Sequence, residues 1–167
     1  MIRGLVIRAA GDADREAIHA LVHAAFEGSG EAELIDRLVA DDDVVLELVA
    51  THEDKLVGHV LFSRLLVETG TRLVPAVALA PLSVDPECQR TGVGTALVEN
   101  AHHMLQEAGE TLSVVLGDPA YYGRFGYAHD RAAKFESAYQ CEALQALSWG
   151  GAPEDGKLIY APAFSGL

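Results

Sequence analysis

Apolar and polar positions along the chain change period several times, and each change marks a predicted element. Runs rich in β-branched and apolar residues predict strands over 5–8, 44–51, 56–67, 73–84, 111–116 and 157–160. Apolar residues spaced three and four apart predict helices over about 15–26, 31–39 and 92–108, with a shorter one over 119–125. Asp12 or Asp14 is expected to cap the first helix.

The order of these elements predicts one mixed α/β domain. The first long strands follow one another through short turns such as 52–55, which is typical of antiparallel hairpins. A strand, the helix over 92–108 and another strand then follow. We therefore expect a mostly antiparallel central sheet with helices on both faces. The tail from Ala128 onward gives no clear pattern beyond its last strand.

The loop before the helix over 92–108 carries the strongest chemical signal. Backbone N–H groups and the helix dipole at such a helix start attract anions, and Gly92 and Gly94 let a phosphate approach the backbone closely. The Walker motif is excluded because no Gly-Lys pair precedes Ser or Thr. The dinucleotide motif is incomplete because Leu97 stands where its third glycine belongs. The sequence therefore predicts a phosphate-bearing ligand of another kind.

Two motifs together resemble the GNAT N-acetyltransferase superfamily. Gln89-x-x-Gly92-x-Gly94, after a strand that ends Leu-Ser-Val-x-Pro, resembles its coenzyme A loop. About 30 residues later, Tyr122-Gly123-Arg124-Phe125-Gly126-Tyr127 resembles its Tyr-x-x-x-Gly-aromatic segment. The resemblance covers residues 3–130 and is strongest to small bacterial members. We expect a single N-acetyltransferase domain over 1–167, with a core at about 3–130 and a C-terminal extension at about 131–167.

The resemblance implies transfer of an acetyl group from acetyl-CoA to a primary amine by direct attack in a ternary complex, without a metal. It also implies a bulge in the strand over 73–84, which Pro81 fits. That strand would bind the pantetheine arm and supply N–H donors to the oxyanion, through Leu82, Ser83 or Val84. The pyrophosphate would be held by Gln89, Arg90, Thr91, Gly92, Val93, Gly94 and Thr95.

The resemblance also places catalytic groups. Tyr122 stands at the family position of the acid that protonates the leaving thiolate, whose pKa is about 8.5. A lysine-like amine has a pKa near 10.4, so its deprotonation at neutral pH costs roughly 4–5 kcal/mol and needs a base. Glu31 and Glu33 follow a Gly-Ser-Gly segment in the region that lines the acceptor cleft of relatives. Asp118 lies near Tyr122 in sequence and is a further candidate, unless it only caps the helix at Pro119. A water chain without a single base is the alternative.

Other interpretations of the same motifs stay open. The chain could be a non-catalytic acyl-CoA binding or sensor module, or a phosphate-ligand protein of another class. Cys88 precedes the loop and could act as a nucleophile, although direct attack is the family norm. Aminoglycosides, polyamines, amino acids and protein N-termini all qualify as the acceptor, whether a small molecule or a peptide amine. Members of this fold often form homodimers, but no interface is evident in the sequence.

Composition narrows the classes of partner. The net charge of −13 argues against nucleic acid, which needs clustered cations. It would attract a cationic amine, or serve solubility alone. Neither a membrane span nor a signal peptide is evident, and the chain has only two cysteines. We therefore expect a cytoplasmic protein with no membrane partner. His19 and His23 are expected to form a surface pair rather than a metal site.

Overall fold

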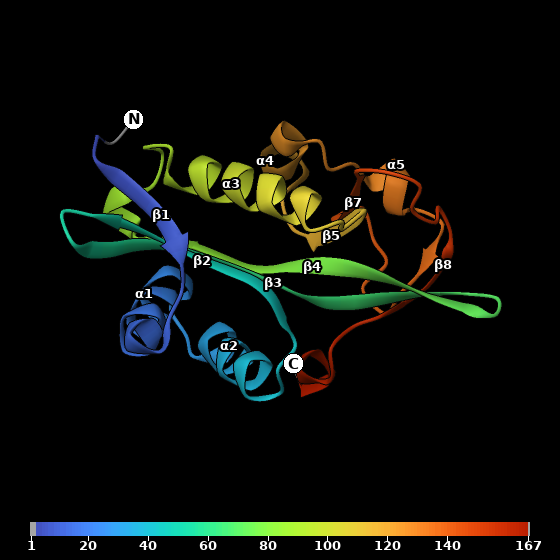
Figure 1. The fold of residues 1–167 in the computed structure, drawn as a ribbon, viewed down its shortest axis with the longest axis horizontal. Helices are drawn as coiled ribbons and strands as arrows, with labels where there is room; N and C mark the ends of the chain where they lie inside the picture. The colour runs from blue at the N-terminus through green and yellow to red at the C-terminus, as the bar shows by residue number, and fades with distance from the viewer. Residues whose placement is uncertain (1–2, 167) are drawn as a thin grey trace.

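A central sheet with helices on both faces forms the structure, a computed structural model that describes residues 3–166. Helices α1 and α2 lie on one face, and α3 and α4 lie on the other (Figure 1). The α-helices are α1 (Arg15–Phe26), α2 (Gly30–Ala40), α3 (Val93–Glu107), α4 (Pro119–Tyr122) and α5 (His129–Ala132). The strands are β1 (Leu5–Ala9), β2 (Val44–His52), β3 (Lys55–Thr69), β4 (Arg72–Val84), β5 (Leu112–Leu116), β6 (Phe135–Glu136), β7 (Leu144–Ser148) and β8 (Gly156–Ile159).

The sheet is mostly antiparallel, as the sequence predicts. Its main strand order is β1-β2-β3-β4-β5-β7, and along this path only β4 and β5 run parallel. The parallel pair is joined through α3, because a parallel connection needs a crossover. The expected fold class is therefore confirmed, and the expected elements lie within a few residues of the observed ones.

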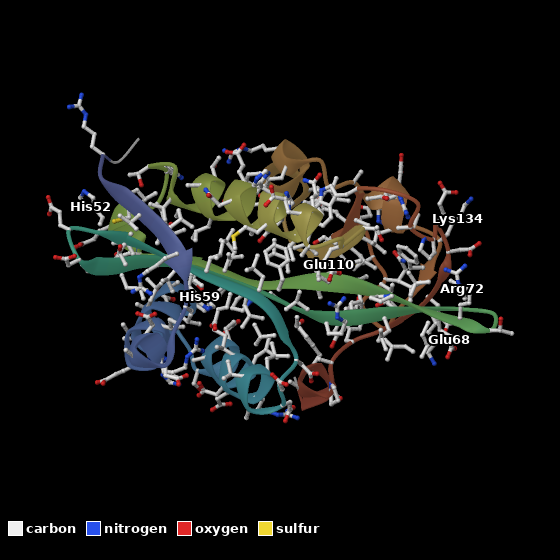
Figure 2. All side chains as sticks on the ribbon, viewed as in Figure 1. His52, His59, Glu68, Arg72, Glu110 and Lys134 are labelled. Carbon is white, nitrogen blue, oxygen red and sulfur yellow. The ribbon has the colours of Figure 1, made fainter. Side chains whose placement is uncertain are left out.

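The C-terminal segment pairs with strands of this sheet and is part of it. Strand β7 pairs with β5, and β8 pairs with the far half of β3 at Leu66–Glu68. Figure 2 labels Glu68 and Arg72 at that end of the β3–β4 hairpin, and Lys134 directly before β6, which joins the hairpin through β8. Strand β8 corresponds to the expected strand over 157–160. Strand β6 is two residues long, too short for an alternating pattern to identify it.

The expected bulge in β4 is confirmed. In the β3–β4 ladder, Val60 faces Leu82 and Phe62 faces Leu79, so Ala80–Pro81 of β4 stand opposite a single residue of β3. The parallel ladder between β4 and β5 ends at Leu79. Beyond the bulge, β4 has no ladder with β5 among the described residues, and its outer edge is left available to a ligand.

Two apolar cores hold the helices to the sheet. Phe62 and Leu97 belong to the core under α3, and Ile18 and Leu38 belong to the core under α1 and α2. All four side chains are almost fully buried. Within residues 3–166, no helix is both long and apolar enough to cross a membrane.

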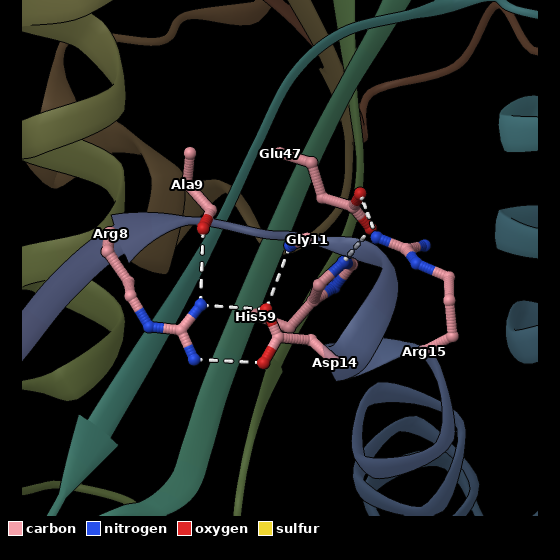
Figure 3. Close-up of polar contacts among 7 residues, drawn as sticks. All are labelled: Arg8, Ala9, Gly11, Asp14, Arg15, Glu47 and His59. Atoms are coloured by element: carbon pink, nitrogen blue, oxygen red, sulfur yellow. Dashed lines mark hydrogen bonds and ion pairs between the residues drawn. The ribbon is translucent and has the colours of Figure 1, made fainter.

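A buried ion-pair network fixes the start of α1 to the sheet (Figure 3). The Glu47 carboxylate forms an ion pair with Arg15 and accepts a hydrogen bond from Nε2 of His59 at 2.7 Å. The His59 side chain is fully buried, so this histidine has a core role. Burial by itself raises the pKa of Glu47, but the bonds from His59 and Arg15 outweigh burial and leave that pKa below its usual value.

Asp14, one of the two aspartates expected to cap the first helix, binds Arg8 and the Gly11 N–H. Asp14 occupies the N-cap position of α1 but makes no side-chain capping bond there. Its carboxylate instead accepts two hydrogen bonds from Arg8, at 2.7 and 2.9 Å, and one from the Gly11 N–H (Figure 3). The Arg8 hydrogen bond, more than any other contact, lowers the pKa of Asp14 to about 2. Asp14 therefore does not cap α1 itself, but through the Gly11 N–H it caps the 3-10 turn Asp12–Asp14 that leads into α1.

Candidate functional site

A cavity of about 590 Å³ lies at the N-terminus of α3, and we call it the loop cavity. The backbone there adopts the left-handed region at Arg90 (φ 66°) and Gly92 (φ 95°). This conformation favours glycine and turns the loop sharply into the helix. The cavity is lined by Leu82, Val84, Cys88, Gln89, Arg90, Gly92, Gly94, Thr95, Tyr121, Tyr122 and Arg124.

Gly94 is required by a close contact. A Cβ atom at this position would collide with the hydroxyl of Tyr121. The absence of a side chain lets the first turn of α3 and the Tyr121 ring share one wall of the loop cavity. The second glycine of the motif therefore has a packing reason, whereas the first, Gly92, has a conformational one.

Two arginines supply the positive charge of the loop cavity. Among the lining residues, Arg90 and Arg124 are the cationic ones. Arg124 donates a hydrogen bond to the Thr95 hydroxyl at 2.9 Å, and its guanidinium lies 5.2 Å from the centre of the Tyr121 ring. Together with the N–H groups of the helix start, these cations suit a diphosphate. Sequence reasoning did not assign Arg124, although it lies inside the second motif.

Backbone alternation decides which residues of β4 can bind a ligand. The Asp85 N–H donates to the Val57 carbonyl of β3 at 2.8 Å. Because successive N–H groups of a strand point to opposite sides, the Ser83 N–H also faces β3. The N–H groups of Leu82 and Val84 therefore face away from β3, toward the opening beyond the bulge.

The ten residues expected to bind the cofactor divide into those that line the loop cavity and those that do not. Seven of the ten residues expected to bind the cofactor line the loop cavity: Leu82, Val84, Gln89, Arg90, Gly92, Gly94 and Thr95. Ser83, Thr91 and Val93 do not line it. The side chains of Ser83 and Val93 are buried in the fold, and the Thr91 hydroxyl donates to the Cys88 carbonyl. Their side chains shape the loop rather than its surface.

A second cavity of about 440 Å³ opens where β4 and β5 part, and we call it the slot cavity. Its walls come from both strands, from α1 and α2, and from the C-terminal segment. It is lined by Phe26, Glu31, Leu34, Ala78, Leu79, Ala80, Pro81, Leu82, Val114, Val115, Leu116, Gly117, Asp118, Tyr122, Tyr139, Leu144, Tyr160 and Phe164. Leu82 and Tyr122 line both cavities, so the two meet there.

Tyr122 is placed and protonated for hydrogen-bond donation. Its ring packs edge-on against Tyr121 and Tyr127, with centroid distances of 5.1 and 5.9 Å. Burial raises its pKa to about 12, with a smaller contribution from Tyr121. The hydroxyl therefore carries its proton throughout the neutral range, at the junction of the two cavities.

The two glutamates proposed as bases occupy different places on α2. Glu31, in the first turn, lines the slot cavity. Glu33 is exposed and lines neither cavity. The helical rotation of about 200° between them accounts for the difference. The structure brings Glu31 and Tyr122 into one cavity and leaves Glu33 outside it.

This arrangement, a parting between two parallel strands beside an anion-binding loop, defines an acyltransferase of the GNAT type. The chain belongs to that family: residues 6–129 match the family model described as an acetyltransferase (GNAT) domain. It is similar to the uncharacterized N-acetyltransferase YhbS of Escherichia coli strain K12, with 36% identity over 148 residues, 84% of this chain and 87% of the relative.

Solved structures show the same relationship. The crystal structure of YhbS from Escherichia coli in complex with CoA superposes with a TM-score of 0.87 at 30% identity, covering 96% of this chain and 92% of that one. A GNAT family acetyltransferase from Brucella melitensis in complex with acetyl-CoA superposes with a TM-score of 0.82 at 31% identity, covering 98% and 99% of the two chains. The expected family and fold are thus confirmed.

Proposed function

We propose that this protein transfers the acetyl group of acetyl-CoA to a primary amine by direct attack in a ternary complex. The observation that carries the proposal is the junction of the two cavities at Leu82 and Tyr122. A donor bound in the loop cavity can present its thioester there, and an amine can reach the same point through the slot cavity. The complexes of similar proteins with CoA and acetyl-CoA support this choice of donor.

The residues of the loop cavity fit coenzyme A. The pyrophosphate would lie against the N–H groups from Gly92 to Thr95, with Arg90 and Arg124 as counter-charges. The pantetheine arm would run along the outer edge of β4, where the N–H groups of Leu82 and Val84 face the opening. This edge is available because the ladder with β5 ends at Leu79.

In the proposed reaction, the lone pair of the amine nitrogen attacks the thioester carbon. A carbon–nitrogen bond forms, the carbon–sulfur bond breaks, and the electron pair of the broken bond leaves with the sulfur. The N–H of Leu82 or Val84 donates to the carbonyl oxygen as it becomes negative. The Tyr122 hydroxyl donates its proton to the departing sulfur.

The ammonium proton must also leave, before or during the attack. Glu31 is the carboxylate of the slot cavity on the α2 side, and we assign it to accept this proton directly or through water. Glu33 lies outside both cavities and is not assigned a role. Cys88 lines the loop cavity but not the slot cavity, so a covalent cysteine intermediate is disfavoured.

The donor is tested by thermal unfolding with acetyl-CoA, CoA, ATP or NAD. A ligand at 100 times its Kd stabilises the native state by about 2.7 kcal/mol, which raises the Tm by roughly 5–10 °C for a domain of this size. We expect this shift with acetyl-CoA and CoA only. In Gly94→Ala the new Cβ displaces Tyr121 into the loop cavity, so the shift should fall by at least half. A larger shift with ATP or NAD would refute the proposal, and CoA binding without turnover would support the binding-module interpretation.

The base is tested by the pair Glu31→Gln and Glu33→Gln. Both variants remove one charge from the first turn of α2, so their effects on the helix are matched. Glu31→Gln should lower kcat/KM for the amine at least about 100-fold, the low end of general base catalysis, and Glu33→Gln should change it less than about 2-fold. Steady-state rates of thiol release measure both. Equal rates in the two variants would favour a water chain without a single base.

A further inference from the structure

Three aromatic side chains of the C-terminal segment, Tyr139, Tyr160 and Phe164, form one wall of the slot cavity. Tyr139 packs edge-on against Tyr160 with ring centroids 5.1 Å apart, and Tyr160 packs at a tilt against Phe164 with centroids 5.7 Å apart. The hydroxyl of Tyr139 donates to the Phe164 carbonyl at 3.3 Å, and that of Tyr160 is hydrogen-bonded to Ser137 at 3.1 Å. Because the protein itself engages both hydroxyls, the wall offers ring surface rather than polar groups.

The exposed rim of the cavity is apolar as well. Six large apolar side chains are well exposed among the described residues, and two of them, Phe26 and Leu116, line this cavity. Their exposed fractions are 41% and 51%. Phe26 ends α1 and Leu116 ends β5, so elements far apart in sequence bring them to one opening. Clustered exposed apolar groups of this kind mark binding sites.

The charge inside the cavity is small and of one sign. Glu31 and Asp118 are its charged lining residues. Asp118 is engaged as the N-cap of α4, where its carboxylate accepts from the Ala120 N–H at 2.9 Å. Glu31 takes part in none of the ion pairs within residues 3–166. Glu31 is thus the lining carboxylate that has neither a capping bond nor a cation partner among these residues.

From this wall, rim and charge we propose that the acceptor is a small hydrophobic monoamine. Its amine lies between Glu31 and the thioester, and an aryl or branched alkyl substituent lies against Tyr139, Tyr160 and Phe164. This inference rests on the proposed function. A polyamine or an aminoglycoside would bring several charges or hydroxyls to a surface with few partners for them, at a desolvation cost. The volume of about 440 Å³ is in the range of small-molecule sites.

The test is a panel of amines with the full-length protein and acetyl-CoA, followed by thiol release. We expect kcat/KM for 2-phenylethylamine to exceed that for ethanolamine about 10- to 100-fold, the effect of burying one aromatic group. Spermidine and kanamycin should react no better than ethanolamine. A preference for any of the three polar amines would overturn the inference. With ethanolamine as acceptor, a preference for octanoyl-CoA over acetyl-CoA would also overturn it, because the cavity would then hold the acyl chain.

A matched pair of variants ties the preference to this cavity. Leu116→Ser removes an exposed leucine from the rim, and Leu73→Ser removes one with 57% exposure at the far end of β4. Both positions are open enough for the proteins to fold. Leu116→Ser should lower the 2-phenylethylamine-to-ethanolamine ratio about 5-fold, and Leu73→Ser should leave it unchanged. The same ratio in both variants would refute the assignment.

The failures of the two proposals are distinguishable. If polar amines are acetylated best, amine acetylation holds and only the hydrophobic class is wrong. If no amine raises thiol release above the rate of acetyl-CoA alone while CoA still raises the Tm, the acetyltransferase proposal itself fails, and the acceptor inference fails with it.

Discussion

Replacement of Tyr122 by phenylalanine is expected to lower kcat about 100-fold, the low end of what a positioned acid contributes. The phenylalanine ring keeps the packing against Tyr121 and Tyr127 and loses only the hydroxyl. KM for acetyl-CoA should change little, because the phosphate contacts lie elsewhere in the loop cavity. Steady-state kinetics with 2-phenylethylamine, or with the best amine found, measures both constants.

Tyr121→Phe is the matched control for this prediction. Tyr121 lines the loop cavity only, and its hydroxyl faces Gly94. Its loss should change KM for acetyl-CoA without a large effect on kcat. A similar fall in kcat in both variants would mean that Tyr122 acts through packing. A Tyr122→Phe enzyme with full kcat would remove the acid role and leave protonation of the sulfur to water.

Replacement of Glu47 by glutamine is expected to destabilise the fold by about 3 kcal/mol, as when one partner of a buried ion pair is removed. Arg15 and His59 would then share a neutral amide in place of a carboxylate. For a domain of this size, the Tm should fall by roughly 6–12 °C. Glu99→Gln is the control, because Glu99 is exposed in α3, and surface changes stay within about 0.5 kcal/mol.

The effect of Glu47 should depend on pH with a definite sign. The pKa of Glu47 is lower in the fold than the ordinary glutamate value of 4.5. A carboxylate with a lowered pKa stabilises the protein fully above the unfolded value and loses this contribution as pH falls through the folded value. The gap in Tm between the wild type and Glu47→Gln should therefore be constant above about pH 5.5 and shrink below pH 4.5. A gap that grows on acidification would contradict the assignment.

The coenzyme A loop and the Tyr122 segment could be predicted from the sequence because their chemistry is local. The loop from Gln89 to Thr95 needs only glycines at the start of a helix, and a helix start binds anions whatever surrounds it. Tyr122 was found in the same way, from a short segment with fixed spacing. The bulge at Ala80–Pro81 was expected from the family resemblance and fits Pro81, which has no N–H to donate to a ladder.

The roles of residues that act through long-range contacts could not be predicted from the sequence. The sequence predicted Leu82, Ser83 and Val84 equally as N–H donors, since it does not show which of these N–H groups face β3. Glu31 and Glu33 were likewise equal candidates for the base, and only the packing of α2 placed Glu31 in the lining of the slot cavity. Arg124 was not assigned a role from the sequence, and only the fold of the 3-10 turn Gly123–Phe125 against α3 brought it beside Thr95.

The sequence alone determined the family resemblance, the mixed sheet and the anion loop, because hydrophobic period and backbone chemistry act over a few residues. The tertiary structure decided the acceptor side. Its aromatic wall comes from Tyr139, Tyr160 and Phe164, in a tail whose pattern predicted little. That tail acquires a position by pairing β8 with β3 and β7 with β5, and the hydrophobic pattern of a strand does not say which distant strand it will pair with.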